Sequence, residues 1–239
     1  MTFEAVAPVL LSFARCSAFL STFPLTSDKV VPPRLRAALA LMLSLAVAPA
    51  RPGGELFLAL PGEVLLGCIA GFAGRLVFAG AEAGGQLMGL SLGLGFAGQF
   101  DPAMGDNELP TARIARTLAG LAFLACGGLG DSLRAVLGPT VSGPGLLGAG
   151  RVLVDEAGRV LIVGIRLAAP ALAAGLVSNL AAAAASRAAP ALNVFSVALA
   201  LMFVVGATVL IATSPLAARE LMLVGRRVAA VVAQASGGP

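Results

Sequence analysis

The sequence predicts an all-α integral membrane protein. Hydrophobic residues make up 58% of the 239 residues and charged residues only 12%, far from the balance of a soluble domain. Several apolar runs reach the roughly 18 residues that can cross a hydrocarbon core. Helices satisfy their own backbone hydrogen bonds in lipid, whereas open sheets leave an edge unpaired. The chain length then allows one membrane domain of about five to seven helices of ~20 residues each.

Prolines and glycines divide the chain into the expected helices. Pro24 is expected to end the first helix, and Ser214-Pro215 to break the last one, because proline lacks the backbone N–H that continues a helix. No polar loop follows the third segment, so a helical hairpin or a re-entrant piece is expected near Ala83. The glycine-rich residues 130–153 are expected to be only partly helical. The expected segments cover approximately residues 3–23, 35–47, 61–83, 84–102, 113–126, 160–185 and 191–213.

The stretch 84–102 is the most distinctive part of the sequence. Small residues recur in it at every fourth position, namely Gly85, Gly89, Gly93 and Ala97. Such a stripe lets a neighbouring backbone approach one face of a helix closely. Asp101-Pro102 is expected to end this helix, since the residue before a proline disfavours α geometry. On these residues alone, the stretch is a packing helix in a membrane bundle.

The positive charge does not indicate a nucleic-acid partner. The net charge of +4 comes from arginines that are scattered singly through apolar segments rather than gathered in a basic stripe. Arg15, Arg75 and Arg166 lie inside apolar runs, where a cation costs about 2.5–3.5 kcal/mol or more. We therefore expect these three charges to be buried, against other subunits or along a water-filled path. The distribution of basic residues does not settle the topology, because six spans from an outside N-terminus would leave Arg226 and Arg227 outside.

Groups that carry catalysis are missing from the sequence. There is no histidine, which excludes a hydrolase of the Ser-His type. Asp101, Asp106 and Glu108 are expected to form a solvated turn rather than a metal site with oxygen ligands. Proton-coupled transport would need acids inside the spans, and Glu63, Glu82 and Asp131 lie only near their edges. We expect no enzyme, no cofactor and no metal.

Two alternatives from other classes remain open at this point. A small secondary transporter could place its substrate site at the broken glycine-rich helix, but it would show internal inverted repeats and polar partners in mid-span. A membrane enzyme that modifies lipids would need a histidine or clustered acids within the spans, and neither is present.

Two sequence patterns stand out. Residues 85–102, GQLMGLSLGLGFAGQFDP, form a glycine-rich run that ends in Asp-Pro, and residues 179–201 contain Asn179, Arg187, Pro190, Asn193 and Phe195. Together they resemble the family of the flagellar export-gate protein FliR and its type III secretion counterpart SctT. That family has a glycine-rich helix ending in Asp-Pro and the signature Asn…Arg-x-x-Pro-x-hydrophobic-Asn-x-Phe. Weaker matches are Arg15, Pro24, Pro32 and Arg34-Leu35-Arg36 near the N-terminus, and FLACGGLGDSL at residues 123–133.

The chain departs from the family pattern at three places. The histidine of the family is replaced by Leu129 or absent, and Ala191 follows Pro190 where the family usually has glutamine. The proline that the family often has in the following helix is replaced by Ala200 or a neighbour. The Asp-Pro at residues 101–102 favours a flagellar machine, whereas the Gly127-Gly128 pair favours an injectisome. Of these two systems, the flagellar one is our prediction.

The resemblance implies a structural subunit of the protein-export gate of a flagellar-type (type III) secretion apparatus. Its implied partners are FliP-like and FliQ-like membrane proteins (SctR and SctS in injectisomes), an FlhB-like or SctU-like export protein, and unfolded protein substrates. The implied location is the bacterial inner membrane, as a multi-pass protein at the flagellar basal body. The family looks like a fusion of its two small partners, which here implies a FliP-like part at about residues 1–128 and a FliQ-like helical hairpin at about 155–239.

The resemblance also implies roles for particular residues. By position, residues 103–112 correspond to the plug of the closed pore. The implied pore or plug residues are Phe96, Phe100, Asp101, Pro102, Met104 and Gly105. Phe96 and Phe100 could equally pack against lipid or a partner, because their period alone does not separate the two.

The signature around Pro190 can be read as a tight turn or as a partner contact. Pro190 favours a helix boundary, Arg187 supplies a cation near the preceding helix C-terminus, and Asn193 can cap the next helix. In the other interpretation, Arg187, Pro190, Asn193 and Phe195 contact an export-gate partner at the cytoplasmic end.

Overall fold

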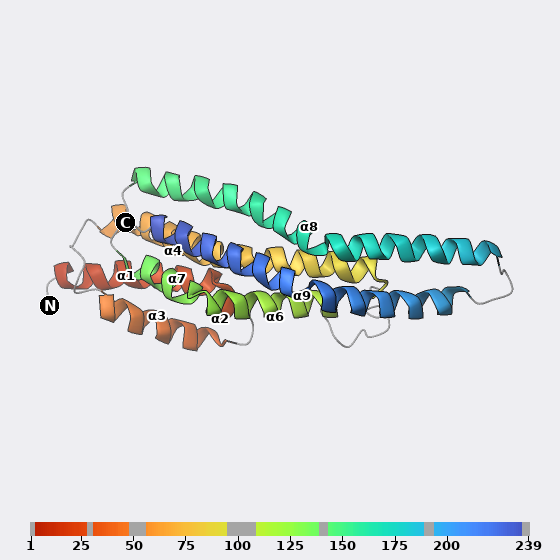
Figure 1. Ribbon diagram of the computed structural model, residues 1–239. Coiled ribbons are helices and arrows are strands. Elements are labelled where there is room, and N and C mark those ends of the chain that lie inside the picture. Colours follow the sequence, from red (N-terminus) through yellow and green to blue (C-terminus); the bar gives the residue numbers. More distant parts are fainter. Residues whose placement is uncertain are drawn as a thin grey trace. The chain divides into compact units, whose positions relative to one another are not determined.

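The structure is a computed structural model that describes residues 3–27, 31–47, 56–94, 109–138, 143–188 and 194–235. Helices are the only regular elements in these ranges, which confirms the all-α prediction. Figure 1 shows them along the chain. They are α1 (Phe3–Thr22), α2 (Pro24–Ser27), α3 (Pro33–Val47), α4 (Leu56–Ser91), α6 (Pro110–Ala125), α7 (Gly128–Leu137), α8 (Gly143–Ala188) and α9 (Val194–Ala235).

Three helices in the described part of the chain are long and apolar enough to cross a membrane. These segments are Ala59–Ser91, Leu153–Ala188 and Ala200–Leu223, and the bent pair α6 and α7 adds a fourth if it counts as one span. The described residues thus contain fewer helices of membrane length than the five to seven expected for the chain. The 15 residues of α3 extend only ~22 Å at 1.5 Å per residue, short of a hydrocarbon core of ~30 Å. By the same measure the 46 residues of α8 extend ~69 Å, about twice the thickness of that core.

The glycine-rich helix differs from its prediction at both ends. α4 runs without interruption from Leu56 to Ser91, so the hairpin expected near Ala83 is absent. It also ends ten residues before Asp101, because residues 92–94 form a turn in which Gly93 has a φ of 74°. A left-handed conformation of this kind suits glycine, which has no Cβ to strain. A packed glycine is tolerated inside α4, whereas Gly93 ends the helix.

The last helix continues through Pro215, where a break was expected. Proline has no N–H to donate to the carbonyl of Ile211, four residues earlier in the helix. The Ser214 hydroxyl donates to that carbonyl oxygen instead, at 2.9 Å. Since a neighbouring side chain satisfies this acceptor, α9 reaches Ala235. α8 likewise begins at Gly143 rather than near residue 160 and passes through Pro170.

The chain forms two compact units. The first comprises Met1–Val77, Phe123–Gly158 and Val224–Pro239, and the second comprises Phe78–Ala122 and Arg159–Leu223. Each unit is assembled from segments that are distant in the sequence, and α4, α6, α8 and α9 contribute to both. The predicted division into FliP-like and FliQ-like parts stays a prediction.

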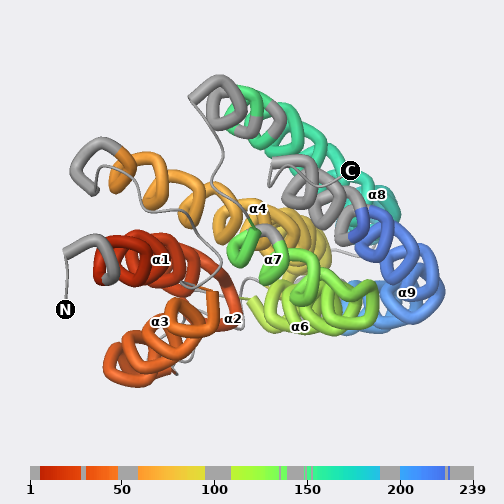
Figure 2. The backbone as a smooth tube through the Cα atoms, turned by 90° about the vertical axis from the view of Figure 1, so that its left-hand side faces the viewer, coloured from red at the N-terminus to blue at the C-terminus, as the bar shows by residue number. Residues whose placement is uncertain are grey.

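In the first unit, α1 packs between α3 and the N-terminal half of α4. Figures 1 and 2 show α1 and α3 side by side. α4 meets α1 through small residues, and a Cβ added to Gly67 would lie 2.9 Å from the Cβ of Ala18. The Phe23 ring lies 4.8 Å from Phe19 and 6.0 Å from Phe123, measured between ring centroids. Such aromatic pairs add about 0.5–1.5 kcal/mol each beyond the burial of their area.

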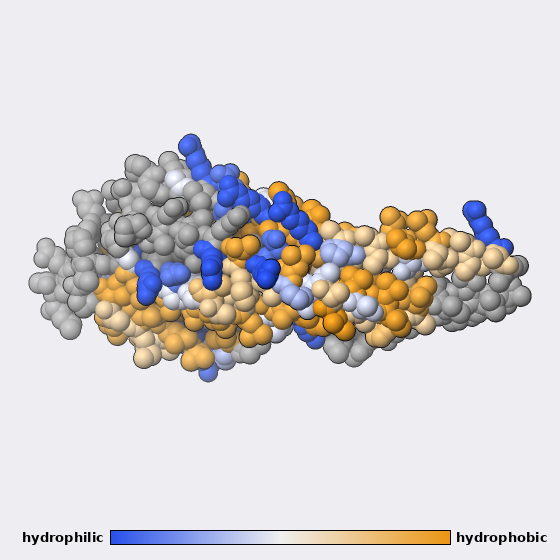
Figure 3. All heavy atoms as spheres, in the orientation of Figure 1, coloured by the Kyte–Doolittle hydropathy of each residue, from blue (hydrophilic) through white to orange (hydrophobic). Residues whose placement is uncertain are grey.

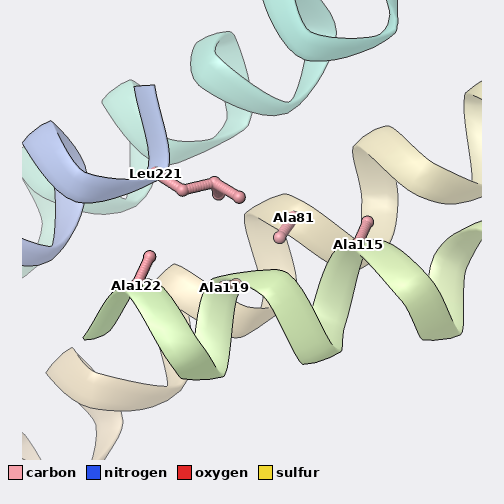
Figure 4. Close-up of a cluster of buried hydrophobic side chains, with 5 residues drawn as sticks. All are labelled: Ala81, Ala115, Ala119, Ala122 and Leu221. Atoms are coloured by element: carbon pink, nitrogen blue, oxygen red, sulfur yellow. The ribbon is translucent and has the colours of Figure 1, made fainter. Parts of the chain in front are cut away.

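In the second unit, small residues bring three helices together around the C-terminal half of α4. α6 presents an alanine face of Ala115, Ala119 and Ala122, which forms a buried cluster with Ala81 and Leu221 (Figure 4). α8 crosses α4 at glycines, and a Cβ added to Gly84 would lie 2.7 Å from the Gly164 carbonyl oxygen. In a membrane the hydrophobic effect does not drive helices together, so helices associate through the van der Waals contacts that small residues allow.

Candidate functional site

The end of α4 lies directly against the first turn of α6. Gly85 is buried, and a Cβ added to it would lie 2.6 Å from the Ala112 Cα and 2.7 Å from the Thr111 carbonyl oxygen. Gly89 is also buried, and a Cβ there would lie 2.8 Å from Cδ1 of Leu109. Gly85 thus faces the backbone of α6, whereas Gly89 faces the side chains of Leu109 and Thr111, and both contacts are too close for an added side chain.

Both ends of the segment that contains the predicted plug lie at Gly89. On the N-terminal side, the Leu94 N–H donates to the Gly89 carbonyl oxygen at 2.9 Å. On the C-terminal side, Leu109 is 8% exposed and packs on the same glycine. Leu92, just before this segment, is buried with residues of α8, so α4, α6 and α8 all contribute to this region of the second unit.

All six predicted pore or plug candidates lie outside the described part of the chain. Residues 95–108 include every one of the pore or plug candidates, namely Phe96, Phe100, Asp101, Pro102, Met104 and Gly105, as well as Ala97. Of the predicted plug at 103–112, the structure describes only Leu109 and the three residues after it, and Pro110 is the first residue of α6. The assignment of a plug therefore stays a prediction.

A buried ion pair joins three helices of the first unit. The Arg15 guanidinium on α1 donates through Nε to a carboxylate oxygen of Glu63 on α4. Its Nη1 also donates to the carbonyl oxygens of Val136 at 3.3 Å and Gly138 at 2.9 Å, at the end of α7. The two charged side chains are 1% and 3% exposed. Desolvating both charges is costly unless geometry and further hydrogen bonds compensate, and here two backbone carbonyl oxygens accept hydrogen bonds from Nη1 of Arg15.

Glu63 is the one functional candidate that sequence reasoning underrated. It was placed at the edge of a span, with no connection to Arg15, which lies 48 residues earlier. The available signal was the presence of an acid in an apolar, glycine-rich helix, since an ionisable residue inside a membrane segment usually has a partner. Pairing over that distance depends on which helices pack together, so the local sequence did not reveal it.

The other two arginines that were expected to be buried are exposed in this chain. Arg75 on α4 and Arg166 on α8 both lie on the outer side of their helices. The chain by itself therefore does not bury them, because the glycine and alanine faces of these helices are the ones that turn inward. Burial by another subunit or exposure to a water-filled path stays a prediction.

The signature around Pro190 is described only in part. Arg187 is exposed in the last turn of α8, and Phe195 lies in the first turn of α9. Pro190 and Asn193 lie outside the described residues, between these two helices. A cation in the last turn of a helix interacts favourably with the helix dipole, which fits the structural interpretation of Arg187.

The described residues contain no group of three or more histidine, cysteine, aspartate or glutamate side chains that could hold a metal ion. What they do contain is close helix packing, long apolar helices and one desolvated ion pair. These features define an α-helical membrane protein whose helices associate through small residues.

Comparison with known proteins identifies the family. The model of "Bacterial export proteins, family 1" matches residues 6–223. The chain is 32% identical to the flagellar biosynthetic protein FliR of Escherichia coli (strain K12), over 85% of this chain and 83% of that protein. It is 31% identical to FliR of Aquifex aeolicus (strain VF5), over 89% of this chain and 87% of that protein. The chain belongs to this family of bacterial export proteins, which confirms the resemblance to FliR and links the chain to flagellar biosynthesis and protein export.

Proposed function

We propose that this protein is a structural subunit of the protein-export gate of a flagellar-type secretion apparatus, and that it forms the export pore together with FliP-like and FliQ-like membrane proteins. The observation that carries this proposal is the family match, which spans residues 6–223 and is accompanied by flagellar relatives that align over most of the chain. Its proposed location is the bacterial inner membrane at the flagellar basal body. The same relatives favour the flagellar machine over the injectisome.

The surface of the long helices supports assembly with other subunits. The membrane-length window of α9 has a mean hydropathy of 2.0, yet only 6% of it is buried within the chain. Phe203, Val204 and Ile211 are among its exposed side chains. Hydrophobic residues also cover much of the described surface that is visible in Figure 3. Contiguous apolar surface of this extent indicates contact with other proteins or lipid.

The lengths of α8 and α9 support the same conclusion. Each is about twice as long as a hydrocarbon core is thick, so lipid alone does not match the whole helix. Neighbouring subunits that extend beyond the bilayer would cover the remainder. The proposed plug at residues 103–112 rests on the resemblance. Its supporting feature is that Leu94, which precedes the plug, and Leu109, which lies within it, both contact Gly89.

The proposal is tested by expressing the full chain alone, with its FliP-like and FliQ-like partners, and with two unrelated small membrane proteins as a control. We expect a stable, monodisperse complex only with the cognate partners, measured by size-exclusion chromatography with light scattering. A stable monomer that forms no complex with the cognate partners would overturn the proposal. Deletion of residues 103–108 in the complex tests the plug separately, by ion leakage across vesicles. We expect increased leakage, and unchanged leakage would remove the plug assignment.

A further inference from the structure

α7 is a helix that its own sequence stabilises poorly. It has only 10 residues, and isolated helices shorter than about 12–15 residues are marginal in water. Two of these residues, Gly128 and Gly130, are poor helix formers. At the N-terminal end, Gly127 provides no side-chain hydrogen bond to cap the first turn. Contacts with other helices must therefore keep α7 helical.

The C-terminal end of α7 does not close in the usual way. The last four carbonyl oxygens of a helix have no donor within it, and one of them belongs to Val136. Many helices satisfy such carbonyls through a left-handed glycine turn, but Gly138 is extended, with a φ of −66° and a ψ of 175°. Pro139 follows in the sequence and has no N–H to donate. These features leave the end of α7 open to a donor from another helix.

Arg15 on α1 provides such a donor. Its Nη1 donates to the carbonyl oxygens of Val136 at 3.3 Å and Gly138 at 2.9 Å, while its Nε donates to Glu63 on α4. A guanidinium presents five N–H groups in fixed directions, so one side chain can bind a carboxylate and a helix end together. A cation at a helix C-terminus also interacts favourably with the helix dipole. Arg15 thus has the chemistry of a C-terminal cap that comes from another helix.

Glu63 and Gly67 hold Arg15 in this position from α4. Glu63 neutralises a guanidinium that is only 1% exposed and would otherwise be costly to desolvate. Gly67, one turn further along α4, lies directly against the carbonyl oxygen of Arg15, so the backbones of α1 and α4 touch at this level. A shift of α1 along α4 would therefore move the guanidinium away from the end of α7.

We propose that Arg15 is a positioning residue that caps α7 from α1, and that it couples the packing of α1 on α4 to the helical state of the last turn of α7. With Arg15 paired to Glu63, this turn is closed. With the guanidinium displaced, the turn opens. All of these residues belong to the first compact unit. The inference goes beyond the proposed function and does not depend on which partner proteins surround the chain.

Removal of the whole ion pair separates capping from the cost of a buried charge. Breaking a buried ion pair at one partner is strongly destabilising, whereas apolar residues of similar volume can replace the whole pair at little cost. Arg15→Met alone should therefore lower the Tm, and Arg15→Met combined with Glu63→Leu should recover most of that loss. The end of α7 lacks the guanidinium in both proteins.

Hydrogen exchange of the purified full chain, followed by mass spectrometry, measures the opening of α7. In the double variant we expect residues 131–138 to exchange about tenfold faster than in the wild type, because a hydrogen bond to a charged group has been lost. α3, which also packs on α1, is the internal reference and should keep its wild-type rate. Wild-type exchange at residues 131–138, or an equal acceleration in α3, would overturn the proposal.

Arg134→Gln is the matched control variant. Arg134 also lies in the last turn of α7, but its side chain is 85% exposed and forms an ion pair with Asp131 on the same helix. Exposed pairs of this kind contribute little, so exchange at residues 131–138 should change less than about twofold. A change as large as that in the double variant would show that arginine content, rather than capping by Arg15, controls the end of α7, and would also overturn the proposal.

Discussion

Substitution of Gly85 by alanine should loosen the packing of α4 on the first turn of α6. The added Cβ would meet three backbone atoms, namely the Ala112 Cα at 2.6 Å, the Thr111 carbonyl oxygen at 2.7 Å and the Ala112 nitrogen at 2.9 Å. Ordinary van der Waals contact begins at 3.4 Å. No flexible side chain can yield here, so the backbone of α6 itself would have to move.

The magnitude follows from two opposing terms. Overpacking of a tight interior costs about 1–3 kcal/mol, whereas replacement of glycine by alanine in a helix gains up to ~1 kcal/mol. We expect a net loss of about 1–2 kcal/mol, which corresponds to a fall in Tm of about 2–8 °C for a chain of this size. Gly62 is the matched control on the same helix, because a Cβ there has nothing within 4 Å. Gly62→Ala should leave the Tm unchanged or raise it.

The assay is thermal unfolding of the purified complex, with both variants measured in the same detergent and lipid. A Gly85→Ala protein that melts at or above the wild-type temperature would show that the packing of α4 on α6 is not as tight as described. A Gly62→Ala protein that loses as much as Gly85→Ala would show that glycine content, rather than contact with α6, controls stability.

Three further predictions concern single interactions. Arg15→Gln or Glu63→Gln should each lower the stability of the protein by about 3–5 kcal/mol in a chemical denaturation series, because a buried charge then loses its ionic partner; additive losses in the double variant would argue against a coupled pair. Ser214→Ala should lower the stability by about 0.5–1.5 kcal/mol in the same assay, because the Ile211 carbonyl loses its hydrogen bond. In a protein that also carries Pro215→Ala the loss should be almost zero, since the restored backbone N–H of residue 215 can donate to the same carbonyl. Equal losses with and without Pro215→Ala would contradict this compensation. Gly127→Ala should lower the Tm, because the φ of 76° between α6 and α7 is strained for alanine, whereas a Tm equal to wild type would mean that this turn relaxes freely.

The helix boundaries show how far sequence reasoning extends. The start of α3 was expected at residue 35 and lies at Pro33, because an apolar run bounded by prolines is a local signal. The continuity of α4 across Ala83 was missed, since glycine-rich residues are weak helix formers alone and become helical only where neighbours pack on them. Pro215 was expected to end α9 because proline lacks a backbone N–H. The Ser214 hydroxyl donates to the carbonyl oxygen that this N–H would have served, so the helix continues.

The candidate site divides in a similar way. The small-residue spacing at Gly85 and Gly89 was visible in the sequence, while the identity of the surface they contact was not. Arg15 was expected to be buried, and its pairing with Glu63 follows only from the packing of α1 on α4. Arg75 and Arg166 have the same local context as Arg15 but lie on the outer side of their helices, so an apolar neighbourhood in sequence does not decide burial.

By itself the sequence determined that the chain is a membrane protein, that it is helical and which family it belongs to. Composition, the length of apolar runs and motifs are properties of the chain before it folds. Only the tertiary structure decided where helices end, which charges are buried and which partner Arg15 has. These features depend on contacts between residues far apart in the chain, and a backbone contact at one glycine can outweigh the intrinsic preference of a whole turn.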